Sequence, residues 1–186
     1  MSKLCNAKNL LGAGLVALAL PGLALAGDVE FNEAGELIRP DVDDWAFVSV
    51  SAAAGGDTSM MAEGEEAQAP QEGDFHIIRM TRDAFKTYMK TGEFPEGTMF
   101  STSIFALADE GSRMFGRELK AMEFGVKDSE RFEDGWAFYR FANGQKTAAA
   151  EPKERCFDCH AERGAVDHVF TQLYTVFRNT GRAGTE

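Results

Sequence analysis

Cysteine and histidine are scarce in this chain, with three of each in 186 residues. Cys5 lies in an apolar N-terminal stretch, which leaves Cys156 and Cys159 for the remainder of the chain. A structural zinc site needs a second pair of ligands, and the sequence has no further cysteines to provide it. A redox-active dithiol of the thioredoxin type would follow a strand and open a helix within a redox fold. The scarcity of cysteine therefore restricts the chemistry of this one pair.

Positive charge is also in short supply. Lys and Arg total 19 against 30 Asp and Glu, a formal net charge of −11. Nucleic acids are bound through Lys and Arg, so this balance argues against a nucleic-acid partner. An acidic surface suits a protein that meets a small neutral ligand or a basic partner protein.

The N-terminal residues 1–26 predict a signal peptide. A weakly basic start and an apolar run over 10–25 lead to the small residues "ALAG", 24–27, which are typical of cleavage after Ala26. The run is short for a membrane-spanning helix. We therefore expect export to the periplasm and a single domain, 27–186, which is long enough for a proper core.

The stretch "CFDCH", residues 156–160, has the pattern of a covalent haem attachment site. In such a site the thiols of Cys156 and Cys159 add to the two vinyl groups of the haem. His160 is then held beneath the iron as its axial metal ligand. Export to a compartment where disulfides persist, with no other cysteine to pair, agrees with this use of both thiols. We expect one covalent haem c.

The position of the motif limits the kind of haem protein. No methionine follows His160, so the chain lacks the downstream Met ligand of small electron-transfer cytochromes. A bundle of four long amphipathic helices would suit a late motif, but the residues before it alternate with a period of two, which is typical of strands.

The periodicity predicts an α+β fold, mainly an antiparallel sheet of about five strands packed with short helices. The expected helix, 82–91, begins after Thr81 as N-cap and ends at Gly92. The acidic stretch 54–73 is expected to be a loop, and "AGELIRP" a short helix or turn that ends at Pro40. The expected strands are 45–53, 74–80, 98–107, 117–128 and 135–141.

A haem-bearing C-terminal helix is expected after the motif and ends at Gly181. It is predicted from apolar residues at helical spacing, namely Val166, Val169, Phe170, Leu173 and Phe177. His168 lies in the same stretch and is interpreted as a structural or surface residue.

Several stretches together resemble the cytochrome P-460 / cytochrome c′-beta family. They are "EFNEAGELIRP", "DWAFV", "TGEFPEGT", "VKDSERF", "GWAFYRF" and "CFDCHAERGAVDHVFTQLY", which span essentially the whole expected domain. The resemblance implies a mainly antiparallel sheet packed on helices, usually in a homodimer. It also implies a five-coordinate haem, with the histidine on one side and an open face for a small ligand on the other.

The resemblance also separates two branches of the family by the residues on the open face. The P-460 enzymes oxidise hydroxylamine and carry a lysine that cross-links to the haem rim. That position falls on Thr102, and no lysine lies between Lys90 and Lys120. An arginine of the same enzymes falls on His76. The cytochrome c′-beta branch lacks the cross-link and is associated with nitric oxide binding in an apolar pocket.

Strand periodicity adds a physical expectation to this comparison. If Thr102 faces the haem, Phe100 and Ile104 face it too, and the wall is apolar with one hydroxyl. Such a wall favours a neutral diatomic such as NO or CO. The alternative is that Phe100 and Ile104 belong to an ordinary core, as most phenylalanines do.

Three functions remain open on the sequence. The first is an exported gas-binding cytochrome. The second is an enzyme, either an oxidase of hydroxylamine or a peroxidase that uses His76 as a proton donor. The third is a simple electron carrier with a redox partner protein. An equally good interpretation of His76 is an ordinary structural histidine on a strand, held by hydrogen bonds.

Overall fold

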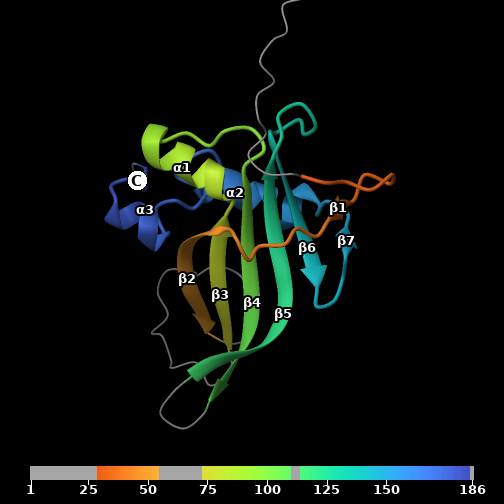
Figure 1. Ribbon diagram of the computed structural model, residues 1–186, viewed down its shortest axis with the longest axis vertical. Helices are drawn as coiled ribbons and strands as arrows, with labels where there is room; N and C mark the ends of the chain where they lie inside the picture. Colours follow the sequence, from red (N-terminus) through yellow and green to blue (C-terminus); the bar gives the residue numbers. More distant parts are fainter. Residues whose placement is uncertain (1–28, 55–72, 110–113, 185–186) are drawn as a thin grey trace, which may run out of the picture.

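The computed structural model describes residues 29–54, 73–109 and 114–184 (Figure 1). The expected signal peptide lies outside the described residues, as does nearly all of the expected acidic loop. Within the described part of the chain, no helix has the length and apolar character needed to cross a membrane.

A five-stranded antiparallel sheet forms the centre of the protein, in the order β2-β3-β4-β5-β6. The predicted α+β fold is confirmed. The strands are β2 (Ala46–Ala54), β3 (Gly73–Met80), β4 (Met99–Asp109), β5 (Met114–Lys127) and β6 (Trp136–Ala142). Each strand lies beside its neighbour in the sequence, and α1 lies between β3 and β4 along the chain.

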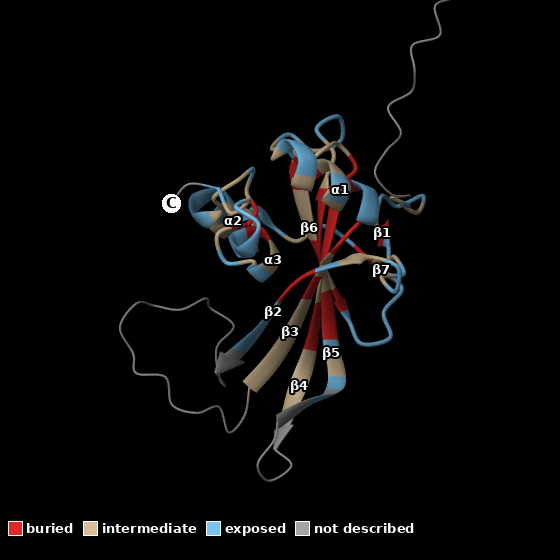
Figure 2. Cartoon of the chain, turned by 60° about the vertical axis from the view of Figure 1, so that its left-hand side comes forward, coloured by how far each residue is buried: buried red, intermediate tan, exposed pale blue. Residues whose placement is uncertain are grey.

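The sheet separates two hydrophobic clusters because successive side chains of a strand point to opposite faces. On one face Val48, Ile78, Met80, Phe100 and Trp136 pack with the helices. The other face carries a second cluster, which consists of Leu37, Met99, Met122, Phe124, Val126, Tyr139, Phe141 and Ala148. Figure 2 shows α2 and α3 on one side of the sheet and the strands β1 and β7 on the other.

The stretch "AGELIRP", which was expected to be a short helix or a turn, does not form a helix. A turn at Gly35, whose φ is +79°, leads into β1 (Leu37–Ile38), which pairs with β7 (Thr147–Ala148). No strand was predicted in the stretch that contains β7. The two short strands cover the second cluster by burying Leu37 and Ala148.

The helix α1 (Arg82–Thr91) has the predicted bounds, and Gly92 ends it in the left-handed conformation with φ of +82°. Thr81 occupies the N-cap position, but its hydroxyl oxygen accepts a hydrogen bond from the Met99 backbone N–H at 3.4 Å. α1 buries Ala84 and Tyr88, and the Tyr88 ring stacks on Phe94 with the ring centres 4.0 Å apart.

The C-terminal segment does contain helices, but the single helix predicted to continue to Gly181 is wrong. After the 3₁₀ turn Lys153–Arg155, α2 (Phe157–Arg163) ends at Gly164, and α3 (Thr175–Asn179) forms only after a series of turns. Asp167 and His168 both have positive φ, 48° and 63°, which no α-helix contains. The apolar residues at helical spacing still reach the core, but from different elements: Val169 and Phe170 are buried from turns, and Phe177 is buried from α3.

Gly164 allows this change of direction because it has no side chain. Its φ of −70° is open to any residue, but a Cβ there would lie 2.4 Å from the His168 carbonyl carbon and 2.8 Å from the His160 oxygen. Both neighbours are backbone atoms, which cannot rotate out of the way.

Replacement of this glycine is therefore expected to disturb the C-terminal segment. We predict that Gly164→Ala lowers the free energy of unfolding by about 1–3 kcal/mol, the usual cost of overpacking, as measured by urea denaturation of the haem-loaded protein. Gly144→Ala is the matched control, because nothing lies within 4 Å of its added methyl and φ alone is unfavourable. Gly164→Ala should also alter the haem absorption bands, whereas Gly144→Ala should not. Wild-type stability and bands in Gly164→Ala would contradict this account.

Candidate functional site

A cavity of about 610 Å³ lies between the C-terminal segment and the sheet face that carries Ile78 and Phe100. The volume is within the range of pockets that hold cofactors and other small molecules. All six residues that the sequence singled out line this cavity: His76, Phe100, Thr102, Cys156, Cys159 and His160. They come from β3, β4 and the start of α2, which are far apart in the sequence.

Cys156 and Cys159 both have free thiols. Cys156 is the residue directly before α2, and Cys159 lies within this helix. Burial, together with the nearby carboxylates of Glu123 and Glu151, raises the pKa of Cys156 to about 11. A redox-active C-x-x-C usually has a thiol whose pKa is lowered. The raised pKa of Cys156 therefore argues against a dithiol oxidoreductase, while both thiols remain accessible to a group in the cavity.

The imidazole of His160 is held in a defined orientation. Its ring lies between Phe138 and Phe170, with ring centres 4.2 and 4.5 Å away. Its Nδ1 lies 2.8 Å from the backbone oxygen of His168, so Nδ1–H donates to that carbonyl. Burial lowers the pKa of His160, although this hydrogen bond partly opposes the shift. The ring is then neutral at pH 7, with the lone pair of Nε2 left for a metal, as is usual for metal-binding histidines.

The opposite wall of the cavity comes from β3 and β4. Phe100, Thr102 and Ile104 share one face of β4, as strand alternation requires, and they all line the cavity. On β3, Ile78 pairs with Thr102 and His76 pairs with Ile104. These residues therefore share one side of the sheet, and their position next to a haem stays a prediction. Phe100 and Ile104 are both buried, so they form part of the core as well as the wall.

His76 has an unusual environment for a histidine. Its Nε2 is buried, and no described residue provides it with a hydrogen-bond partner. Burial lowers the pKa of His76, more than the carboxylates of Glu123 and Asp74 raise it. A buried polar atom without a protein partner is normally explained by a bound water or ligand, so Nε2 indicates where a polar molecule would bind.

The sequence analysis missed a pair of charged residues in the cavity. Glu123 of β5 is directly opposite Thr102 of β4 and Arg140 of β6, and the Arg140 guanidinium donates to the Glu123 carboxylate. We expected an apolar wall with one hydroxyl, but the wall also carries this ion pair. The signal in the sequence was a charged residue at an inward position of an otherwise aromatic strand, "GWAFYRF".

Tyr174 was also missed, because it follows the motif in the segment predicted to be a long helix. Its ring lies 6.0 Å from that of Phe100, across the cavity. Burial raises the pKa of Tyr174 strongly, so its hydroxyl stays protonated at any physiological pH.

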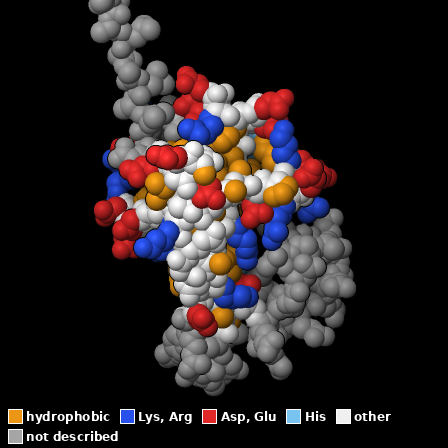
Figure 3. All heavy atoms as spheres, turned by 90° about the vertical axis from the view of Figure 1, so that its right-hand side faces the viewer, with side chains coloured by type: hydrophobic (Ala, Val, Ile, Leu, Met, Phe, Trp, Pro, Cys, Tyr) orange, Lys and Arg blue, Asp and Glu red, His pale blue; other side chains and the backbone are white. Residues whose placement is uncertain are grey.

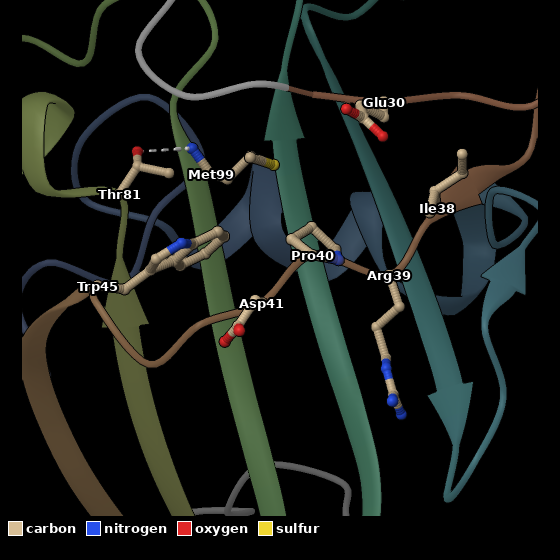
Figure 4. Close-up of a pocket in the computed structure, with 8 residues that line it drawn as sticks. All are labelled: Glu30, Ile38, Arg39, Pro40, Asp41, Trp45, Thr81 and Met99. Carbon is tan, nitrogen blue, oxygen red and sulfur yellow. Dashed lines mark hydrogen bonds between the residues drawn. The ribbon is translucent and has the colours of Figure 1, made fainter.

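A second, smaller cavity of about 340 Å³ lies on the other face of the sheet (Figure 4). Trp45, Pro40 and Asp41 approach it from the N-terminal segment, and Glu30 and Arg39 point away from one another. Its charged groups do not converge on one point, so it lacks the arrangement of a ligand site.

An α+β domain in which a sheet and a C-x-x-C-H helix enclose a cofactor-sized cavity has the features of a β-rich c-type haem protein. Residues 42–171 match the sequence profile of the Cytochrome P460 family, and because this match covers well over half of the chain, the protein belongs to that family. The match is to the family as a whole and does not separate the cytochrome c′-beta branch. No curated protein sequence matches the chain.

Family membership implies a haem c, and the described residues fit one. Two free thiols and a neutral imidazole with an available Nε2 line one cavity. The aromatic walls are suited to a flat apolar ring. Cys156 and Cys159 would hold the haem covalently and His160 would bind its iron.

The two cysteines can be tested separately. We predict that Cys156→Ala and Cys159→Ala each retain haem through a single thioether, and that the double variant loses covalent haem altogether. Intact-protein mass spectrometry of denatured samples measures this directly. Thr102→Ala is the control, because Thr102 lines the same cavity but has no thiol. This variant should keep the full haem mass. Covalent haem in the double variant would show that other residues make the attachment.

Proposed function

We propose that the protein is an exported mono-haem cytochrome that binds a small neutral gas, such as nitric oxide or carbon monoxide, as in the cytochrome c′-beta branch. The observation that carries this proposal is Thr102. It lines the cavity at the position where the P-460 enzymes have their cross-linking lysine. A threonine has no amine, so it cannot form the nitrogen–carbon link to the haem rim.

The walls of the cavity support a neutral ligand. Phe100, Ile78 and Ile104 are each 7% exposed or less, and they present apolar surface beside Thr102. Burial of a charged ligand against such surface is costly unless the charge is paired. Glu123 and Arg140 neutralise one another through their ion pair, which leaves neither charge free for an ionic substrate.

The bound haem would supply an iron that can bind a small ligand. His160 would hold this iron through Nε2, because its Nδ1 is occupied by the His168 carbonyl. The Phe100 and Ile104 side chains would limit the access of water to the cavity. In the described part of the cavity Thr102, His76 and Tyr174 provide polar atoms for a ligand.

An enzymatic function is the second candidate, and His76 favours it. A neutral imidazole with a free, buried Nε2 can accept a proton from hydrogen peroxide and return it to the departing oxygen. The same group could accept a proton from hydroxylamine. The carboxylates of Glu123 and Asp74 lie near His76 and favour its protonated form, although Arg140 and Lys120 oppose them.

The expectations about location and partners belong to the same proposal. The signal peptide, 1–26, would direct the protein to the periplasm, where a homodimer is expected from the family resemblance. Acidic and basic side chains intermingle on the face seen in Figure 3, and that face presents no continuous basic area. A redox partner protein would deliver or remove electrons, and no nucleic acid is expected to bind.

The absorption spectrum tests the gas-binding function. We predict that the reduced protein is high-spin and five-coordinate, and that addition of NO produces a new nitrosyl spectrum. A low-spin spectrum before any ligand is added would mean that a protein side chain closes the sixth position. That outcome would contradict an open site.

Peroxide and hydroxylamine kinetics test the enzyme. If His76 acts as the proton acceptor, His76→Ala should slow the reaction with peroxide by about 10²–10⁴-fold, which is the usual contribution of acid–base catalysis. Because burial lowers the pKa of His76, the wild-type rate should persist below pH 6.5 and decline only at more acidic pH, when the imidazole is protonated. Ser51→Ala on the neighbouring strand is the control. An unchanged rate in His76→Ala, with no hydroxylamine turnover in the wild type, would remove the enzyme hypothesis.

A further inference from the structure

A strained turn lies beside the axial histidine. Val166 and Val169 pair as a small hairpin, with the Val169 N–H donating to the Val166 oxygen at 2.9 Å. The two residues between them, Asp167 and His168, have φ of 48° and 63°. Consecutive positive φ values define a type I′ turn, which usually needs Gly or Asn, because a Cβ is unfavourable there.

The Asp167 carboxylate holds this turn to the sheet. Its Oδ1 accepts a hydrogen bond from Trp136 Nε1 at 3.2 Å. Its Oδ2 accepts one from Lys127 Nζ at 2.6 Å. The same ammonium group donates to the Phe94 carbonyl at 2.8 Å. Asp167 is thus tied to the ends of β5 and β6, which the sheet holds rigid.

The His168 carbonyl of this turn contacts the imidazole of His160. This oxygen accepts the hydrogen bond from His160 Nδ1 at 2.8 Å, and it belongs to the residue directly after Asp167. Neither Asp167 nor Lys127 is among the described residues that line the cavity. Any effect of these two residues on the iron must therefore pass through the turn or through space.

We propose that Asp167 is a positioning residue that controls the iron through the His168 carbonyl. Its carboxylate holds the strained turn, the turn holds the carbonyl on His160 Nδ1, and this hydrogen bond makes the imidazole a stronger donor to the metal. A stronger donor stabilises ferric over ferrous iron and so lowers the reduction potential. The proposal rests on the binding of haem iron by His160.

Two substitutions separate positioning from simple electrostatics. Loss of the Asp167 charge would raise the reduction potential by either route. Loss of the Lys127 charge has opposite effects by the two routes. The electrostatic effect of removing a positive charge lowers the reduction potential, whereas release of the turn raises it. Lys127→Met is therefore the decisive variant, and it also serves if Asp167→Ala does not fold.

The experiment uses the haem-loaded protein, with the ferric/ferrous midpoint potential and the iron–histidine stretching frequency of the ferrous form as measurements. We expect Asp167→Ala to shift the equilibrium toward ferrous iron about tenfold, which is about 59 mV for one electron. Lys127→Met should shift it in the same direction by a smaller factor. Both variants should lower the stretching frequency. Asp167→Asn, which keeps an acceptor for Trp136 and tolerates positive φ, should shift less than Asp167→Ala.

Asp83→Ala is the matched control, since it removes one exposed carboxylate and its ion pair with Lys86 on the distant helix α1. It should leave both measurements at their wild-type values. A lower or unchanged potential in Lys127→Met would overturn the role of Asp167. If the ferrous wild-type protein is five-coordinate and still has no iron–histidine band, then His160 is not the ligand, and both this proposal and the proposed iron site fail.

Discussion

The alternation of side chains along a hydrogen-bonded antiparallel sheet is the constraint on which this structure depends. Because neighbouring residues on each strand must face opposite sides, β4 sends Met99 to one cluster and Phe100 to the other. The N-terminal segment covers the first of these faces. The C-terminal segment covers the second, but its turns do not fill the space above Thr102 and Ile104, and the cavity lies there. The position of the candidate haem site is thus a consequence of how the two faces are covered.

Charge inside this cavity is balanced within the protein. Glu123 and Arg140 face one another across β5 and β6, and each compensates the other. The Arg140 and Glu123 side chains are 36% and 42% exposed, so solvent screens this pair and its contribution to stability is small. The same arrangement gives the cavity polar groups without net charge. It fits a neutral gas, and it also provides His76 with a carboxylate neighbour if the ligand must give up a proton.

The region of the sheet was predictable because its signals are local. Strand alternation, the Gly92 stop of α1 and the turn glycines act over a few residues, and the predicted strands agree with β2 to β6 to within a few positions. The C-terminal segment was not predictable in this way. Its apolar residues have helical spacing, but Gly164 and the ion pair of Asp167 with Lys127 hold it in turns. Lys127 lies 40 residues before Asp167, so a local pattern contains no trace of this contact.

The sequence by itself determined the motif chemistry and the alternation that turns Phe100, Thr102 and Ile104 to one side. Covalent attachment needs only two thiols and a histidine at fixed spacing, and a strand's period needs only the backbone. Tertiary structure decided what surrounds them: that Glu123 and Arg140 share the cavity, that no described residue pairs with His76 Nε2, and that the carbonyl of a strained turn accepts a hydrogen bond from His160. Each of these depends on the register between strands or on contacts between distant segments, which only the folded chain brings together.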